Sequence, residues 1–194
     1  MRDPRADPGR RRLAAHGAAL SRLGAVWRVV KRAEHLDGLA GLVVPGGEST
    51  TLIRLLDSSS LWEPVRAFAG SRGFLLGTCA GMILAAREVR SPAQRSLGLI
   101  DITVERNSYG RQIDSFEAYG QFHPPEAPPR PLEMVFIRAP RIVRLGPQVE
   151  ALASCRGDCV LARQGRVLVA SFHPELTGDR TVHQLFASMC RNGR

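Results

Sequence analysis

Two short apolar runs, each ending in a glycine-rich turn, constrain the fold of this chain most strongly. Gly41–Val44 is followed by the turn Pro45–Gly47. Gly73–Leu76 is followed by the turn Gly77–Gly81. Neither run alternates with polar residues, which is typical of strands buried on both faces. A helical pattern follows each turn, and repeated strand–loop–helix units predict a parallel sheet covered by helices.

The remaining segments predict further elements around this sheet. The spacing of Ala and Leu predicts a helix over Leu13–Leu23, which Gly24 ends, and Val26–Val30 is predicted as a short strand. Strand-like segments joined mostly by short turns fill the second half, which indicates antiparallel strands added to the sheet. We further predict helices over 51–56 (capped by Ser49 or Thr50), 61–69, 82–87 and 180–191; strands over 97–105, 133–138, 141–145, 149–154, 159–163 and 167–172; and a surface loop over 122–131 that holds five prolines.

Length and composition are those of one globular domain. The chain has 194 residues, of which 44% are hydrophobic and 23% are charged, enough for a buried core without a disulfide or metal. We predict an atypical basic tail over 1–12 and a domain over 13–194. No apolar run approaches the roughly 18 residues of a membrane span, and the first residues lack a secretory signal. Four cysteines without such a signal predict a reducing, cytoplasmic location.

The net charge of +9 raises the alternative of a nucleic-acid-binding protein. Lys31 is the single lysine among the 27 basic residues. Outside Arg2–Arg12 the arginines are scattered and are not interleaved with aromatic residues. This pattern favours a generally arginine-rich composition over a nucleic-acid surface.

The segment Gly77-Thr78-Cys79-Ala80-Gly81 has the form of a nucleophile elbow, in which a nucleophile lies between glycines on a strand-to-helix turn. Such a turn lifts the nucleophile clear of the sheet. The partial positive charge at a helix N-terminus favours the thiolate form of a cysteine, and the following amide can point at an oxyanion. The alternative is a buried, inert cysteine.

Two further segments carry groups that could assist a nucleophilic cysteine, namely a His–Glu pair and a turn with adjacent glycines. In Ser171–Glu175, residues two apart in an extended chain point to the same side, so Glu175 can lie beside the imidazole of His173 and orient it. In Pro45–Thr50, adjacent glycines let a backbone amide approach a ligand closely. Each segment alone also fits an ordinary strand end or turn. Because ligands bind at the carboxyl edge of a parallel sheet, we expect the two turns and the His–Glu pair to converge there.

In combination these segments closely resemble the glutaminase subunit family of pyridoxal 5′-phosphate synthase, which consists of class I (triad) glutamine amidotransferases. The resemblance covers about Ala14–Phe186. The blocks that carry it, in chain order, are Val44-Pro-Gly-Gly-Glu-Ser-Thr-Thr51, Gly77-Thr-Cys-Ala-Gly-Met82, Val104-Glu-Arg-Asn-Ser-Tyr-Gly-Arg-Gln112, Phe136-Ile-Arg-Ala-Pro140 and Ser171-Phe-His-Pro-Glu-Leu-Thr177. The resemblance implies a flavodoxin-like α/β fold of three layers, with a mostly parallel central sheet and added antiparallel strands.

The resemblance also implies a reaction. Cys79 would attack the side-chain amide of glutamine, His173 would move the proton to the departing ammonia, and Glu175 would orient His173. The amides of Gly47 and Ala80 would form the oxyanion hole. The residues that would hold glutamine are Gly47, Glu48, Ser49, Arg106, Ile137 and Arg138. No cofactor or metal is implied.

The same resemblance implies a partner. Ammonia would pass to a separate synthase subunit, which forms a ring assembly, and the glutaminase would be poorly active without it.

The N-terminus departs from the family pattern, which begins with a buried strand and then a helix containing Glu-His. His16 matches that helix histidine, so the strand would occupy about 5–11. Pro8 removes a hydrogen-bond donor there, and Arg10 and Arg11 would be buried charges. We therefore expect the first strand to be missing, together with the family's glutamine near the oxyanion hole. Either a frameshift or a wrong start site has altered this end, or the chain is a divergent copy with weakened activity or partner binding.

Two other functions stay open alongside the leading one. The glutaminase of another class I amidotransferase shares the triad, although the block Glu105–Ser108 argues against it. A non-catalytic paralogue would keep the triad without docking productively. Cys155 and Cys159 lack nearby histidines, so their spacing does not predict a zinc site.

Overall fold

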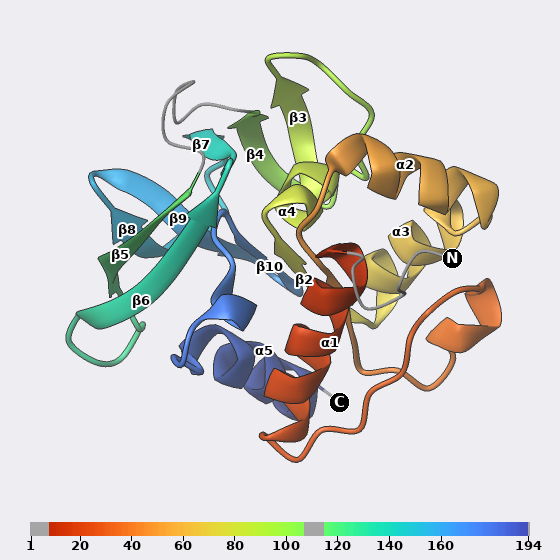
Figure 1. Ribbon diagram of the computed structural model, residues 1–194, viewed down its shortest axis with the longest axis horizontal. Coiled ribbons are helices and arrows are strands. Elements are labelled where there is room, and N and C mark those ends of the chain that lie inside the picture. The colour runs from red at the N-terminus through yellow and green to blue at the C-terminus, as the bar shows by residue number, and fades with distance from the viewer. Residues whose placement is uncertain (1–7, 107–114, 194) are drawn as a thin grey trace.

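A mixed sheet of seven strands runs through the molecule in the order β1-β2-β10-β9-β8-β5-β6 (Figure 1). The computed structural model describes residues 8–106 and 115–193. For Pro8 and Arg10 it describes the backbone but not the side chain. Strands β1, β2 and β10 are parallel, and the other four strands add in antiparallel pairs. The strands are β1 (Gly41–Val44), β2 (Phe74–Thr78), β5 (Ser115–Phe122), β6 (Arg130–Ile137), β8 (Glu150–Cys155), β9 (Asp158–Gln164) and β10 (Val167–Ala170).

Helices cover both faces of this sheet, which gives three layers. Because successive side chains of a strand point to opposite faces, Leu75 enters one apolar core while Phe74 and Leu76 enter the other. The first core includes side chains of α3 and α4, and the second includes side chains of α5. The helices are α1 (Pro8–Ser21), α2 (Ser49–Ser58), α3 (Trp62–Ser71), α4 (Ala80–Ala85) and α5 (Thr181–Asn192), with short 3-10 turns η2 (Ala33–Leu36) and η3 (Pro174–Leu176).

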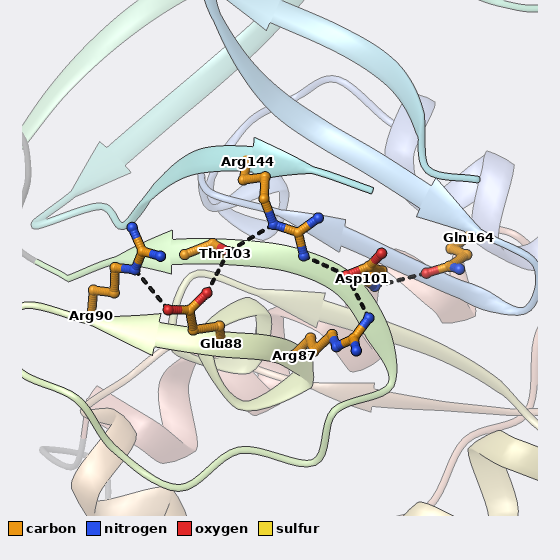
Figure 2. Close-up of polar contacts among 7 residues, drawn as sticks. All are labelled: Arg87, Glu88, Arg90, Asp101, Thr103, Arg144 and Gln164. Carbon is orange, nitrogen blue, oxygen red and sulfur yellow. Dashed lines mark hydrogen bonds and ion pairs between the residues drawn. The ribbon is translucent and has the colours of Figure 1, made fainter. Parts of the chain in front are cut away.

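A second, three-stranded sheet is attached to the first by polar contacts. Its strands are β3 (Ala86–Arg90), β4 (Ile100–Glu105) and β7 (Arg141–Leu145), in the order β3-β4-β7. Asp101 pairs with both Arg87 and Arg144, and its backbone N–H donates to Gln164 Oε1 of β9 at 2.7 Å (Figure 2). The Arg144 hydrogen bond lowers the pKa of Asp101. Glu88, Arg90 and Thr103 extend this network within the small sheet, and the Asp101–Gln164 bond joins it to the large one.

Most predicted elements are confirmed. The strand over 41–44 has its predicted bounds, that over 73–76 is observed as β2, and the helices predicted over 13–23, 51–56, 61–69 and 180–191 are α1, α2, α3 and α5. Helix α2 begins at Ser49, and its N-cap residue, Glu48, makes no side-chain capping bond, so the predicted cap is wrong. Strands β3 and β5 were not predicted.

Two predictions about the edge of the sheet are wrong. Residues 25–31 form no strand, and Val26 is 99% exposed. Strand β1 is half-buried, although its apolar sequence predicted burial on both faces. Within the described residues β1 pairs with β2 alone, so β1 is an edge strand with one side open, and segment 25–31 does not pair with it.

A cavity of about 1210 Å³ lies beside this edge. Its lining includes β1, α1 and the segment 23–31, but no residue of β2. The expected loss of the first strand therefore agrees with the described residues, in which helix α1, from Pro8, comes first and an apolar space adjoins β1. Of the basic tail predicted over 1–12, residues 1–7 lie outside the described residues, and residues 8–12 belong to helix α1, so the prediction of a tail is wrong there.

The contrast between core and edge predicts unequal effects of truncation on stability. Leu76 is fully buried in β2, so Leu76→Ala should lower the free energy of unfolding by about 2–5 kcal/mol. Val26→Ser, at a fully exposed position, should change it by less than about 0.5 kcal/mol. Urea unfolding followed by circular dichroism measures both. A large loss in Val26→Ser would mean that segment 25–31 is packed in solution.

Candidate active site

Cys79 lies on a strained turn between β2 and α4. Its backbone has φ 49° and ψ −104°, a conformation that L residues rarely adopt. The amide of Cys79 donates to Ala170 O at 2.8 Å, which ties the turn to β10. The sharp strand-to-helix turn predicted from the sequence is therefore present, with the cysteine at its apex.

The glycines around Cys79 are required by close backbone packing. A Cβ atom on Gly77 would lie 2.6 Å from Gly81 O, and one on Gly81 would lie 2.0 Å from Val44 O. A Cβ on Gly46 would lie 2.3 Å from Cε1 of His173 and 3.3 Å from Cβ of Cys79. The turn after β1 thus adjoins both His173 and Cys79, as predicted for two turns at one sheet edge.

His173 and Glu175 form a buried pair directly after β10. Nδ1 of His173 lies 2.8 Å from Oε1 of Glu175, and both side chains are at most 1% exposed. The strand ends at Ala170, and Pro174 begins the 3-10 turn η3, which fixes the spacing between the two residues. An ionised carboxylate at Nδ1 makes that atom the protonated one and leaves Nε2 for a second partner.

That second atom is buried and adjoins Cys79. Nε2 of His173 has no hydrogen-bond partner among the described residues. Burial lowers the pKa of His173, but interaction with the nearby Cys79 sulfur, together with the hydrogen bond and charge of Glu175, outweighs burial and raises the pKa to about 9. For Glu175, burial raises the pKa, but the His173 hydrogen bond and nearby histidine charge outweigh burial and lower it. The raised pKa of His173 and the lowered pKa of Glu175 therefore favour an imidazolium beside a carboxylate.

Three further side chains extend this buried group, and sequence reasoning did not assign them to it. His16 of α1 has Nε2 at 3.2 Å from Oε2 of Glu175 and 3.3 Å from Oγ1 of Thr78. Its Nδ1 lies 2.9 Å from Nε2 of His183 on α5. His16 and His183 are 167 positions apart, and no local spacing signals their contact. Because α1 and α5 pack together (Figure 1), the two rings meet.

Three residues predicted to bind glutamine or to form the oxyanion hole lie next to the turn at Cys79 or next to a residue that adjoins it. Ile137 ends β6, and its carbonyl oxygen is 3.8 Å from Sγ of Cys79. Ala80 is the first residue of α4, so its amide is among the N-terminal amides that have no acceptor within the helix. Gly47 follows Gly46 in the turn that adjoins His173. These positions suit an oxyanion hole next to the sulfur.

The other predicted glutamine-binding residues are spread more widely. Ser49 is buried, and its hydroxyl donates to Gln94 Oε1 at 2.9 Å. Glu48 is exposed and accepts from the Thr50 hydroxyl at 2.7 Å. Arg138 is exposed, just after Ile137, and has φ 44°. Arg106 follows β4 in the small sheet, and no contact joins it to Cys79 within residues 8–106 and 115–193. Residues 107–112 of its sequence block lie outside the described residues.

This arrangement can perform nucleophilic catalysis on a carbonyl compound. It combines a sulfur nucleophile on a strained turn, an imidazole beside it, a carboxylate on the far nitrogen and backbone amides nearby. Across the described ranges, no three His, Cys, Asp or Glu side chains are grouped as metal ligands. In those ranges, too, no helix is long and apolar enough to cross a bilayer.

Comparisons with known proteins agree on one family. Residues 11–192 match the model of the SNO glutamine amidotransferase family. The chain is 52% identical over 178 residues to the pyridoxal 5'-phosphate synthase subunit PdxT of Solibacter usitatus, covering 90% of this chain and 92% of that protein. The protein of the same name from Koribacter versatilis is 49% identical over 179 residues, covering 92% and 91%.

Solved structures have the same fold. The crystal structure of a protein described as a glutamine amidotransferase superposes with a TM-score of 0.84 at 43% identity, covering 92% of this chain and 93% of the other. A glutamine amidotransferase from Thermotoga maritima superposes with a TM-score of 0.51 at 14% identity, covering 89% and 71%. The second likeness shows the fold alone, and together they confirm the predicted three-layer α/β class.

Proposed function

Since the chain belongs to the SNO glutamine amidotransferase family, we propose that it hydrolyses L-glutamine to L-glutamate and ammonia with a Cys79–His173–Glu175 triad. The ammonia is passed to the synthase subunit of pyridoxal 5′-phosphate synthase and serves vitamin B6 biosynthesis. The observation that carries the proposal is the buried His173–Glu175 pair, 2.8 Å apart, whose imidazole adjoins a cysteine on a strained turn.

The reaction runs through a thioester. The Cys79 thiolate attacks the side-chain carbonyl carbon of glutamine, and the amides of Gly47 and Ala80 stabilise the oxyanion. The imidazolium of His173 gives its Nε2 proton to the leaving nitrogen, which departs as ammonia. Neutral His173 then takes a proton from water, which attacks the thioester and releases glutamate. Glu175 keeps the proton on Nδ1 throughout and stabilises the imidazolium.

The amino acid part of glutamine is held by groups around this centre. Arg106 and Arg138 offer guanidinium groups that can pair bidentately with an α-carboxylate. The carbonyl of Ile137 and the carboxylate of Glu48 accept hydrogen bonds from an α-ammonium group. Gly47 and Ser49 line the turn that closes on the side-chain amide.

The partner is the synthase subunit in its ring assembly, and the reaction needs no cofactor. We expect the free chain to be poorly active and the complex to be active, in the cytoplasm. An alternative function rests on the cavity beside β1 and on the described residues, in which no strand precedes β1: the chain would then be a weakly active or non-catalytic paralogue.

The test measures glutamate and ammonia released from glutamine by the purified chain, alone and with the synthase subunit. Equal amounts of the two products, at a rate that rises on adding the partner, are expected. An electrophilic diazoketone analogue of glutamine should add one adduct per chain, located at Cys79 by peptide mass spectrometry. Burial raises the pKa of Cys159 to about 11 and also raises that of Cys155, so neither should react. Binding to the partner without turnover would support the paralogue instead.

A further inference from the structure

A second layer of polar groups lies behind the His173–Glu175 pair. Glu175 has no exposed side-chain surface, and only its Oε1 is used by His173. Its other oxygen, Oε2, is buried and makes no hydrogen bond of good geometry with a described residue, yet lies 3.2 Å from Nε2 of His16. A buried carboxylate oxygen without a donor is costly. That distance is at the upper end of N–H···O bonds, so a small rotation of the His16 ring completes one.

We propose that His16, backed by His183, is a positioning residue that holds the Glu175 carboxylate and through it the orientation of His173. The inference rests on the proposed function and goes beyond it, because neither histidine belongs to the triad. It gives helix α1 a role in positioning the catalytic residues, although the sequence over about 5–11 departs from the family pattern.

Only one arrangement of protons suits these contacts. If His16 carries its proton on Nε2, that N–H points toward Glu175 Oε2 and Thr78 Oγ1, while Nδ1 accepts from Nε2–H of His183. The opposite tautomer would place a nitrogen lone pair against a carboxylate oxygen, which is repulsive. The hydrogen bonds then run in one direction, from His183 through His16 to Glu175.

We call the hydrogen-bonded series from His183 through His16 to Glu175 the relay, and both of its histidines are uncharged. Burial lowers the pKa of His16, and it lowers the pKa of His183 to about 4. The groups around His16 are Glu175 from η3, His173 before it, His183 from α5 and Thr78 from β2. A charged His16 would compete with His173 for the single carboxylate, whereas a neutral one fixes the carboxylate and leaves its charge to His173.

The first test removes the donor while keeping the volume. With the synthase partner present, His16→Phe should lower kcat for glutamine hydrolysis about tenfold, by analogy with the loss of hydrogen bonds that orient metal-ligating histidines, with KM unchanged within about twofold. His16→Gln keeps an N–H near the Nε2 position and should restore most of kcat. The matched control is His123→Phe, which removes an exposed histidine whose Nε2 lies 3.0 Å from Oγ of Ser154. Equal losses in the Phe and Gln variants would overturn the proposal.

A double-mutant cycle separates positioning from a general structural role. If His16 acts through Glu175, adding His16→Phe to Glu175→Gln should lower the residual rate by less than about twofold, because the group to be positioned is already altered. The same tenfold loss in both backgrounds would overturn the proposal.

A measurement without turnover keeps this inference distinct from the proposed function. In ¹⁵N-histidine NMR spectra of the complete chain, assigned with His16→Gln, His16 should be neutral at pH 7 and protonated on Nε2. A charged ring or a proton on Nδ1 would contradict the relay even in an active enzyme. If the parent chain with its partner releases no glutamate while the NMR result holds, the proposed function fails and the geometry of the relay stands.

Discussion

Cys79→Ala abolishes glutamine hydrolysis while the chain still folds; this is the largest effect we expect. Without the sulfur no thioester forms, and loss of a nucleophile in a catalytic triad lowers kcat by about 10⁶-fold. The substitution removes one buried atom at a turn that the surrounding glycines hold in place. Glutamate release measured with the synthase partner, and the urea unfolding midpoint, check the two parts of the prediction.

Cys159→Ala is the matched control for Cys79→Ala. Cys159 lies on β9, away from the turn after β2, and its Sγ contacts Leu161 O. It should therefore keep the parent rate. If the Cys79 variant released glutamate at the parent rate, the triad assignment would be wrong. If the Cys79→Ala variant does not fold, the test uses Cys79→Ser, which differs from the parent by one atom.

Glu175→Gln is expected to have the second largest effect, a fall in kcat on the order of 10³–10⁴-fold. The amide cannot hold the proton on Nδ1 of His173 as the carboxylate does, and the negative charge that raises the pKa of His173 is gone. The pKa of His173 should fall from about 9, so less of the imidazolium–thiolate pair exists at neutral pH. The rate of Cys79 alkylation by iodoacetamide, followed from neutral to mildly alkaline pH, measures this shift.

Binding of glutamine should survive in Glu175→Gln, since Glu175 is buried behind His173 and is not among the residues proposed to hold the substrate. The control is Glu34→Gln, which only removes an exposed ion pair with Arg32. An unchanged alkylation profile together with a normal kcat would show that Glu175 does not orient His173.

Much of the candidate site could be predicted because its parts are local in sequence. The turn Gly77–Gly81 follows a buried strand directly. His173 and Glu175 are paired as predicted, although Pro174–Leu176 forms a 3-10 turn and not the extended chain on which the prediction rested. The glycines then fit the close contacts that the fold imposes. Short-range stereochemistry decides all of these features, so one chain sequence is enough to see them.

The parts that sequence reasoning missed depend on helix packing. The sequence predicts no function for His183, because its neighbours along the chain carry no related chemistry. Its partner His16 lies on another helix, and Glu175 reaches His16 only after α1 and η3 pack together. For Arg106 the sequence block is specific, and the fold places this residue directly after strand β4 of the small sheet.

The sequence by itself determined the strand–turn–helix units, the elbow around Cys79 and the pairing of His173 with Glu175, since each depends on residues that are close along the chain. The tertiary structure alone decided that β1 is an edge strand beside a cavity, that 26–30 forms no strand, and that two distant histidines lie behind Glu175. The physical reason is that the burial of a strand and the partners of a buried polar group are set by whichever segments pack next to them, and that packing is not encoded in local spacing.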